Sequence, residues 1–238
     1  MDLTPAELAR TLIAGRRPAS AYLPEAAAPL TVACAAEPDG TPLVLASDEQ
    51  AAALRPVTGD DTALLLAVPD MPPCLVAPAR GEAVLTGWVA PLAGRAARRA
   101  ADAFAAVNPV PELLDLGDGQ RIYRMDLAEV RIDRDEDTAP IELDDYQAAE
   151  PDPLYPDEPC LLAGLAHHAE LRQALLDWAR AAVPDAGSAM PVRLDRNGMV
   201  LLVCRDADVR HLRLVFRRPA CNADTLAATV RGLCRAHP

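Results

Sequence analysis

Four histidines are the residues of this chain best suited to bind a metal or to move protons near neutral pH. His167 and His168 are adjacent, whereas His211 and His237 stand apart from them. No catalytic-triad signature or phosphate-binding loop accompanies these residues, and the 6 cysteines form no C-x-x-C pair. The ligand spacing therefore predicts no zinc site. The residue types alone do not decide whether the chain is an enzyme.

The elements expected around the histidines give each one a different environment. The spacing of apolar residues predicts one long amphipathic helix over 161–183, with His168 on its apolar face. A histidine in that place is either a hydrogen-bonded core residue or a ligand, and both interpretations stay open. His211 falls on an alternating strand pattern and is expected to face outward, and His237 lies in the short C-terminal tail.

Arg217 and Arg218, directly before Pro219, also allow two interpretations. Their guanidinium groups can bind the carboxylates of a ligand or of an acidic partner segment. They can equally mark the exposed end of a strand, because a proline cannot continue a sheet.

The charge of the chain is distributed unevenly. Residues 1–150 hold 25 acidic and 12 basic side chains, whereas residues 151–238 hold 10 and 11. The acidic N-terminal part repels a phosphate backbone, so we expect no nucleic-acid binding. The N-terminus lacks the basic leader of a signal peptide, and no apolar run reaches the roughly 18 residues of a membrane span. We therefore expect a cytoplasmic protein without a membrane partner.

Residues 1–146 carry the signals of short strands with flanking helices. Thr4 begins a capping box, which predicts a helix directly after it. Apolar segments follow, and the turn at 38–40 between two of them predicts a hairpin. A short helical piece is expected around Asp48–Leu54, a further strand at Cys74–Pro78, and a longer helix over Gly94–Val107. This order favours a small antiparallel barrel.

Residues 147–159 form an acidic, proline-rich connector that is expected to run over the surface. Residues 160–238 then predict a helix, three strands and a helix. Asn197-Gly198 separates two apolar strands and predicts a tight hairpin, and Asn222 is placed to cap the last helix. The predicted fold class is α+β, in which an antiparallel barrel with flanking helices precedes a C-terminal α-β-β-β-α domain.

Three motifs in residues 160–238 resemble one known domain. They are A-H-H-A-E-L, then D-R-N-G before an apolar run, then R-x-x-F-R-R-P before the capped last helix. The pattern is similar to the C-terminal domain of HugZ-like haem-utilisation proteins and of the plant glutamyl-tRNA-reductase-binding protein. The helix motif of that family commonly reads N-x-D-H-A-D-A-L, so His168 matches its histidine, whereas its leading Asn and Asp are replaced. The other matching positions are Asp195, Gly198, Arg213, Phe216 and Pro219.

Relatives with this tail usually carry an N-terminal split β-barrel similar to the flavin-binding barrel of pyridoxamine-phosphate oxidases. The strands expected between residues 18 and 133, and the L-T-G-W-V segment at 85–89, are consistent with such a barrel. The resemblance therefore implies a split barrel in residues 1–146 and a homodimer formed through it, with ligands at the shared interface. The plant relative's role also suggests a protein partner.

The resemblance makes flavin and haem the two candidate cofactors. Flavin mononucleotide needs cationic partners for its phosphate, and residues 18–54 contain no arginine or lysine, so flavin is not expected. Haem needs an axial ligand, usually histidine, and often an arginine near its propionates. His237 and His168 are the candidate axial ligands, the first because HugZ-type haem oxygenases take theirs from a C-terminal segment. The other candidate haem-binding residues are His211, Arg217 and Arg218.

Three functions are consistent with this sequence. The one we favour is a HugZ-like haem-binding protein that uses a dimer-interface cavity, with no turnover implied. The second is a non-enzymatic regulatory or partner-binding module of the same fold that has lost its cofactor. The third is a haem-degrading oxygenase.

Overall fold

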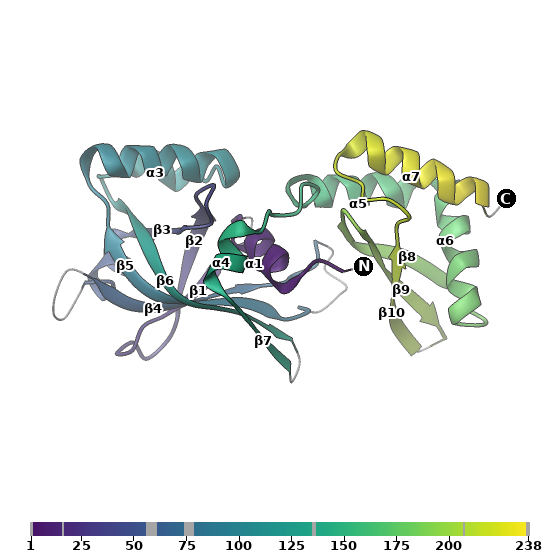
Figure 1. Ribbon diagram of the computed structural model, residues 1–238, viewed down its shortest axis with the longest axis horizontal. Coiled ribbons are helices and arrows are strands. Elements are labelled where there is room, and N and C mark those ends of the chain that lie inside the picture. The colour runs from purple at the N-terminus through teal and green to yellow at the C-terminus, as the bar shows by residue number, and fades with distance from the viewer. Residues whose placement is uncertain are drawn as a thin grey trace. The chain divides into compact units, whose positions relative to one another are not determined.

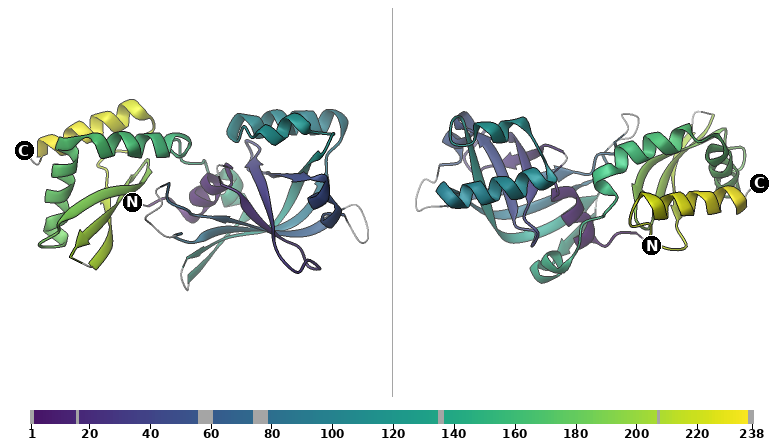
Figure 2. Two further views of the ribbon diagram at one scale, coloured as in Figure 1. Left: turned by 180° about the vertical axis from the view of Figure 1, so that it is seen from behind. Right: turned by 90° about the horizontal axis from the view of Figure 1, so that it is seen from above.

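The computed structural model describes residues 2–15, 17–55, 61–73, 79–134, 137–206 and 208–236 (Figures 1 and 2). The chain divides into two compact units, which we call the barrel unit and the C-terminal unit. The barrel unit consists of the described residues of Thr4–Met71 and Ala79–Pro151, and the C-terminal unit mainly of those of Asp152–Pro238. The strand expected at Cys74–Pro78 lies outside the described residues.

The barrel unit contains a closed barrel of six antiparallel strands. The sheet runs in the order β3-β2-β1-β4-β5-β6, and a further pairing of β3 with β6 joins its two ends. A seventh strand, β7, pairs with the second half of β6. The expected antiparallel barrel is therefore confirmed. Its elements are α1 (Pro5–Ile13), β1 (Ala19–Tyr22), β2 (Leu30–Ala36), β3 (Pro42–Ser47), α2 (Asp48–Ala53), β4 (Thr62–Pro69), β5 (Glu82–Pro91), α3 (Gly94–Val107), η1 (Pro111–Asp115), β6 (Gln120–Arg134), β7 (Asp137–Ile141) and α4 (Leu143–Ala148).

Strand β3 is apolar along its length because both of its faces are covered. Leu43 and Leu45 belong to a cluster with Phe104 of α3, which packs on the outside of the barrel (Figure 1). Val44 and Ala46 alternate with them and are also buried, so they face the barrel interior. An outer helix and a filled interior together explain a strand with no polar face.

Local sequence signals set the ends of several elements in this unit. At the start of α1, the Glu7 N–H donates to the Thr4 hydroxyl over 3.2 Å, and the Thr4 N–H donates to the Glu7 carboxylate over 2.8 Å. The hairpin predicted at 38–40 joins β2 and β3. Gly40 has a φ of 92°, and a Cβ there would collide with the Arg10 guanidinium.

The C-terminal unit is a three-stranded antiparallel sheet covered by helices. The strand order is β10-β9-β8, with the predicted hairpin at Asn197-Gly198 between β8 and β9. Leu194, Met199 and Leu214 point from the sheet into one core cluster, together with leucines of the helices. The predicted helix–sheet–helix order is confirmed, with one change in the first helix. The elements are η2 (Tyr155–Asp157), α5 (Glu158–His167), α6 (Ala169–Ala182), β8 (Ser188–Asp195), β9 (Gly198–Arg205), β10 (Asp208–Val215) and α7 (Ala223–Ala236).

The single long helix expected over 161–183 is wrong, because the helix breaks at His168. This residue has an extended conformation (φ −84°, ψ 100°) and caps α6 through its side chain. Leu165 before the break and Leu171 after it are both buried, whereas His168 is exposed. The apolar spacing continues across the break, which is why the pattern predicts one helix. The expectation that His168 lies on the apolar face is therefore wrong as well.

The acidic connector contributes more to the core than its composition predicts. Within residues 147–159, Leu154 and Tyr155 are buried, and so are the carboxylates of Asp152 and Glu158. The Asp152 carboxylate accepts hydrogen bonds from the backbone N–H groups of residues 154 and 196, each over 2.8 Å. Glu158 accepts one from the N–H of residue 194 over 2.7 Å. These bonds satisfy the buried charges, so the expectation of a purely surface segment is wrong.

Candidate functional site

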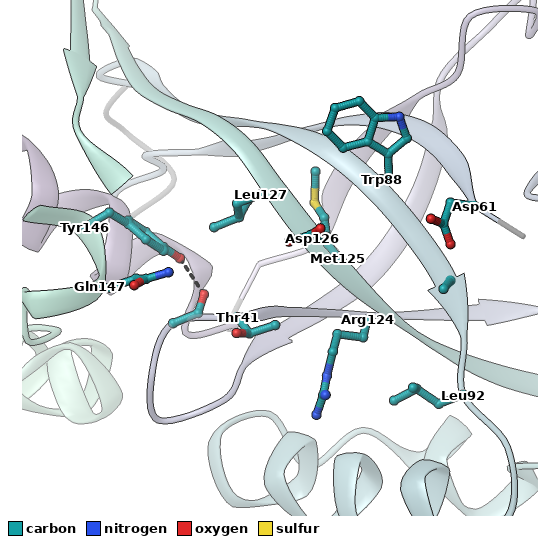
Figure 3. Close-up of a pocket in the computed structure, with 12 residues that line it drawn as sticks. Thr41, Asp61, Trp88, Leu92, Arg124, Met125, Asp126, Leu127, Tyr146 and Gln147 are labelled. Carbon is teal, nitrogen blue, oxygen red and sulfur yellow. Dashed lines mark hydrogen bonds between the residues drawn. The ribbon is translucent and has the colours of Figure 1, made fainter. Parts of the chain in front are cut away.

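A hollow of about 330 Å³ lies on the barrel unit (Figure 3). Trp88 of β5 and Arg124 of β6 lie on its wall, and Tyr146 of α4 lies at one side. Trp88 is 50% exposed, and Arg124 is ion-paired with Glu37 over 2.7 Å. The sequence of the barrel unit contains no histidine, so this hollow offers an aromatic surface without an imidazole ligand.

Trp88 is exposed on β5, beside an irregularity in the pairing of β5 with β6. The register shifts between Thr86 and Gly87, while Trp88 pairs with Asp126. A Cβ at Gly87 would collide with the Asp126 carbonyl, so glycine allows the two strands to approach. Residue 128 of β6 is the extra residue of this irregularity, and Trp88 keeps the outward position between the buried Gly87 and Val89. The L-T-G-W-V segment noted in the sequence is thus the segment that presents this tryptophan.

A second cavity, of about 380 Å³, lies in the C-terminal unit between helices α5 and α7. We call it the α5–α7 groove. Its lining is mostly apolar or small, with Leu165 and Gly164 from α5 and Leu226 and Val230 from α7. Two polar residues with ligand-binding capacity also line it, His168 and Arg231.

The His168 ring is held by the helix that it caps. Its Nδ1 accepts a hydrogen bond from the Leu171 N–H over 3.3 Å. A neutral imidazole has one donor and one acceptor nitrogen, so Nε2 carries the proton in this arrangement. Ligation of a metal through Nε2 moves that proton to Nδ1 and removes the cap, at a cost of about 1 kcal/mol.

The remaining predicted site residues do not join this groove. His211 is exposed on β10 opposite Leu202, and Arg217 and Arg218 are exposed after the strand ends. No hydrogen bond or ion pair between described residues connects these three to His168. His237 lies outside the described residues.

Arg231 is the groove residue that sequence reasoning missed. The sequence pointed to Arg217 and Arg218, because they are adjacent and follow a strand. Arg231 instead shares a helix face with Ala227, four residues before it, which also lines the groove. This spacing of four residues was the available signal, but only the packing of α7 beside α5 relates Arg231 to His168.

The buried titratable groups of the barrel unit have structural roles. Burial raises the pKa of the Cys34 thiol to about 12, which removes its nucleophilicity at neutral pH. Burial also raises the pKa of Tyr146, whose hydroxyl donates to the Gly40 carbonyl over 2.8 Å. Neither group is therefore suited to acid–base or nucleophilic chemistry.

None of the helices in the described part of the chain combines the length and the apolar character that crossing a bilayer requires.

Comparisons with known proteins identify a shared fold. No protein-family model matches the chain, and a search of curated proteins finds no significant match. Among solved structures, the chain is similar to the haem-binding protein from Mycobacterium smegmatis, with a TM-score of 0.64 and 22% identity over 100% of this chain and 98% of that one. A protein of unknown function from Agrobacterium tumefaciens gives a TM-score of 0.43 at 17% identity, over 97% and 98% of the two chains, which supports no inference. At 22% identity, the likeness to the Mycobacterium smegmatis protein establishes that this chain and that protein share a fold.

Proposed function

We propose that this chain is a HugZ-like haem-binding protein. The observation that carries the proposal is the likeness to the haem-binding protein from Mycobacterium smegmatis, which extends over 100% of this chain. The motifs around His168 and the barrel that precedes them support the same assignment. Flavin is not proposed, because the arginine of the barrel hollow, Arg124, already neutralises Glu37.

The residues that line the α5–α7 groove support the proposal that a haem binds there. Haem iron takes an axial ligand such as histidine, and arginine commonly neutralises the propionates. The groove offers His168 as the ligand, apolar walls for the porphyrin, and Arg231 for a propionate. When bound, haem supplies an iron centre. The residues of this chain hold it and exclude water from its apolar faces.

We propose further that a second copy of the chain covers the haem, which makes the site a dimer-interface cavity. The groove lies at the surface of its unit, where Cys160, Ala223 and Arg231 are exposed. Trp88 on the barrel unit gives the homodimer an aromatic contact, because half of its surface is exposed. Aromatic residues are enriched in the buried centres of protein interfaces.

A haem titration of the full chain tests the proposal, and a groove-filling variant tests the site. A Cβ at Gly164 meets no atom within 4 Å, so Gly164→Leu fills the groove without disturbing the packing. Replacing glycine inside a helix also stabilises it by about 0.5–1 kcal/mol. We expect haem affinity to fall at least tenfold in a protein that remains folded.

Gly232→Leu is the matched control for this experiment. Gly232 lies on α7, and a Cβ there likewise meets no atom within 4 Å, but Gly232 is not among the residues that line the groove. We expect its haem affinity to equal that of the wild type. An equal loss of haem affinity in both variants, or no loss in either, would contradict haem binding in the groove.

Turnover is a separate question from binding. A haem-degrading oxygenase would convert bound haem to a bile pigment when a reductant is added in the presence of dioxygen, which absorbance follows directly. We expect the reductant to shift the Soret band of this protein but not to bleach it. If haem causes no spectral change, the second candidate function, a partner-binding module, is favoured instead. The exposed Trp88 would then be the candidate contact for a protein partner.

A further inference from the structure

Three metal-ligating groups of different kinds gather where helix α6 begins and helix α7 ends. The His168 imidazole, the Glu170 carboxylate and the Cys234 thiol each offer one ligand atom, and these atoms lie within 4.8 Å of one another. His168 and Glu170 lie at the start of α6, and Cys234 lies in the last turn of α7. The contact between these two helices assembles the cluster, which explains why no local spacing motif predicts it.

The separations are close to those of a tetrahedral zinc site. Zinc bonds of about 2.0 Å to nitrogen or oxygen and about 2.3 Å to sulfur place neighbouring ligand atoms roughly 3.3 to 3.6 Å apart. His168 and Glu170 are exposed, and Cys234 is half-buried. Their side chains can therefore close a gap of about 1 Å by small rotations about their χ angles, which leave the core unchanged.

The charges of the cluster also favour a cation. The Glu170 carboxylate lies beside the Cys234 thiol. A divalent ion between the two groups stabilises the thiolate, which is the form that ligates metals.

We propose that His168, Glu170 and Cys234 bind a zinc ion, with water in the fourth position. Thiolate, imidazole and carboxylate together are zinc ligands, whereas magnesium and calcium prefer oxygen ligands alone. Three protein ligands plus water is an established arrangement for zinc. The ion links the start of α6 to the end of α7 and so stabilises the C-terminal helix.

Zinc ligation changes the role of His168. Whichever ring nitrogen binds the metal, the neutral ring no longer accepts the Leu171 N–H, because Nδ1 is then either the ligand or protonated. Zinc and haem iron therefore compete for this histidine. That competition rests on the proposed function, whereas zinc binding itself does not.

Zinc binding is measured on the metal-free full chain by competition with a chromophoric chelator. Cobalt in place of zinc reports a thiolate ligand through a sulfur-to-metal charge-transfer band. We expect one zinc per chain, and an affinity at least tenfold lower in Cys234→Ser, Glu170→Gln and His168→Asn. The asparagine variant retains a side chain that caps helices well, so its loss of zinc reflects the loss of the ligand.

Two matched variants serve as controls. Cys221 and His167 are exposed residues of the same unit that do not belong to the cluster. Cys221→Ser and His167→Asn should bind zinc as the wild type does. Circular dichroism and thermal unfolding of the metal-free proteins verify that each variant is folded.

The proposal is overturned by an absence of stoichiometric zinc binding, by binding that persists in Cys234→Ser, or by equal losses in the controls. A haem titration of the same proteins separates this result from the proposed function. Zinc bound without a haem signal contradicts only the haem proposal, and haem bound without zinc contradicts only the zinc site. Weaker haem binding to the zinc-loaded chain is the expected result when both hold.

Discussion

The ring of His168 accepts a hydrogen bond from the Leu171 N–H over 3.3 Å and thereby starts helix α6. His168 thus has a structural role in addition to any role as a ligand. The two roles can be separated by substitution, because asparagine caps a helix without offering an imidazole.

We expect His168→Ala to lower the free energy of unfolding by about 1 kcal/mol, which is the usual cost of losing an N-cap. The free energy of unfolding of His168→Asn should stay within about 0.5 kcal/mol of the wild-type value. Urea unfolding of the metal-free and haem-free proteins provides the measurement. Equal stability of the alanine and asparagine variants would show that the cap contributes nothing.

The parts of the fold that were predicted correctly depend on local chemistry. The capping box at Thr4 and the Asn197-Gly198 hairpin each satisfy backbone groups within a few residues, so the sequence predicts them directly. The break at His168 was missed because the apolar spacing continues through it. The α5–α7 groove and the Cys234 cluster were missed because distant segments form them.

Tyr146 provides a test of how the barrel unit is held together. Its buried hydroxyl donates to the Gly40 carbonyl over 2.8 Å, and its ring lies 5.5 Å from the Arg10 guanidinium carbon. Tyr146→Phe keeps the ring but leaves a buried carbonyl without this donor. We expect a loss of about 1–3 kcal/mol in the free energy of unfolding.

Tyr22→Phe is the control for that substitution, because Tyr22 is 46% exposed. Its free energy of unfolding should change by less than about 0.5 kcal/mol. Urea unfolding compares the two variants. An unchanged stability of Tyr146→Phe would mean that water replaces the lost donor.

Cys34 should be unreactive in the folded protein. It is fully buried, and burial raises its pKa to about 12, so the thiolate is scarce at pH 8. We expect a thiol-alkylating reagent to modify the exposed Cys160 and Cys221 at least a hundredfold faster. Peptide mass spectrometry measures this difference, which should vanish in denaturant. Comparable native rates would contradict the position of Cys34 inside the barrel unit.

The proposed homodimer makes Trp88 a sensitive position. Trp88→Arg places a charge in the proposed interface, so we expect the dimer to dissociate to monomers in light scattering. Leu114→Arg is the control, because Leu114 is 89% exposed on the same unit and does not line the Trp88 hollow. A wild-type protein that is monomeric, or a dimer that survives Trp88→Arg, would contradict this interface.

Whether the chain binds haem through His168 is tested by a haem titration of the wild-type chain, followed by Soret absorbance. We expect a shifted Soret band that saturates at one haem per chain and is lost in His168→Asn. This variant leaves α6 capped, so its spectrum reports the ligand rather than the fold. A signal that grows linearly without saturation would contradict haem binding, and an unchanged saturable band in His168→Asn would contradict His168 as the ligand.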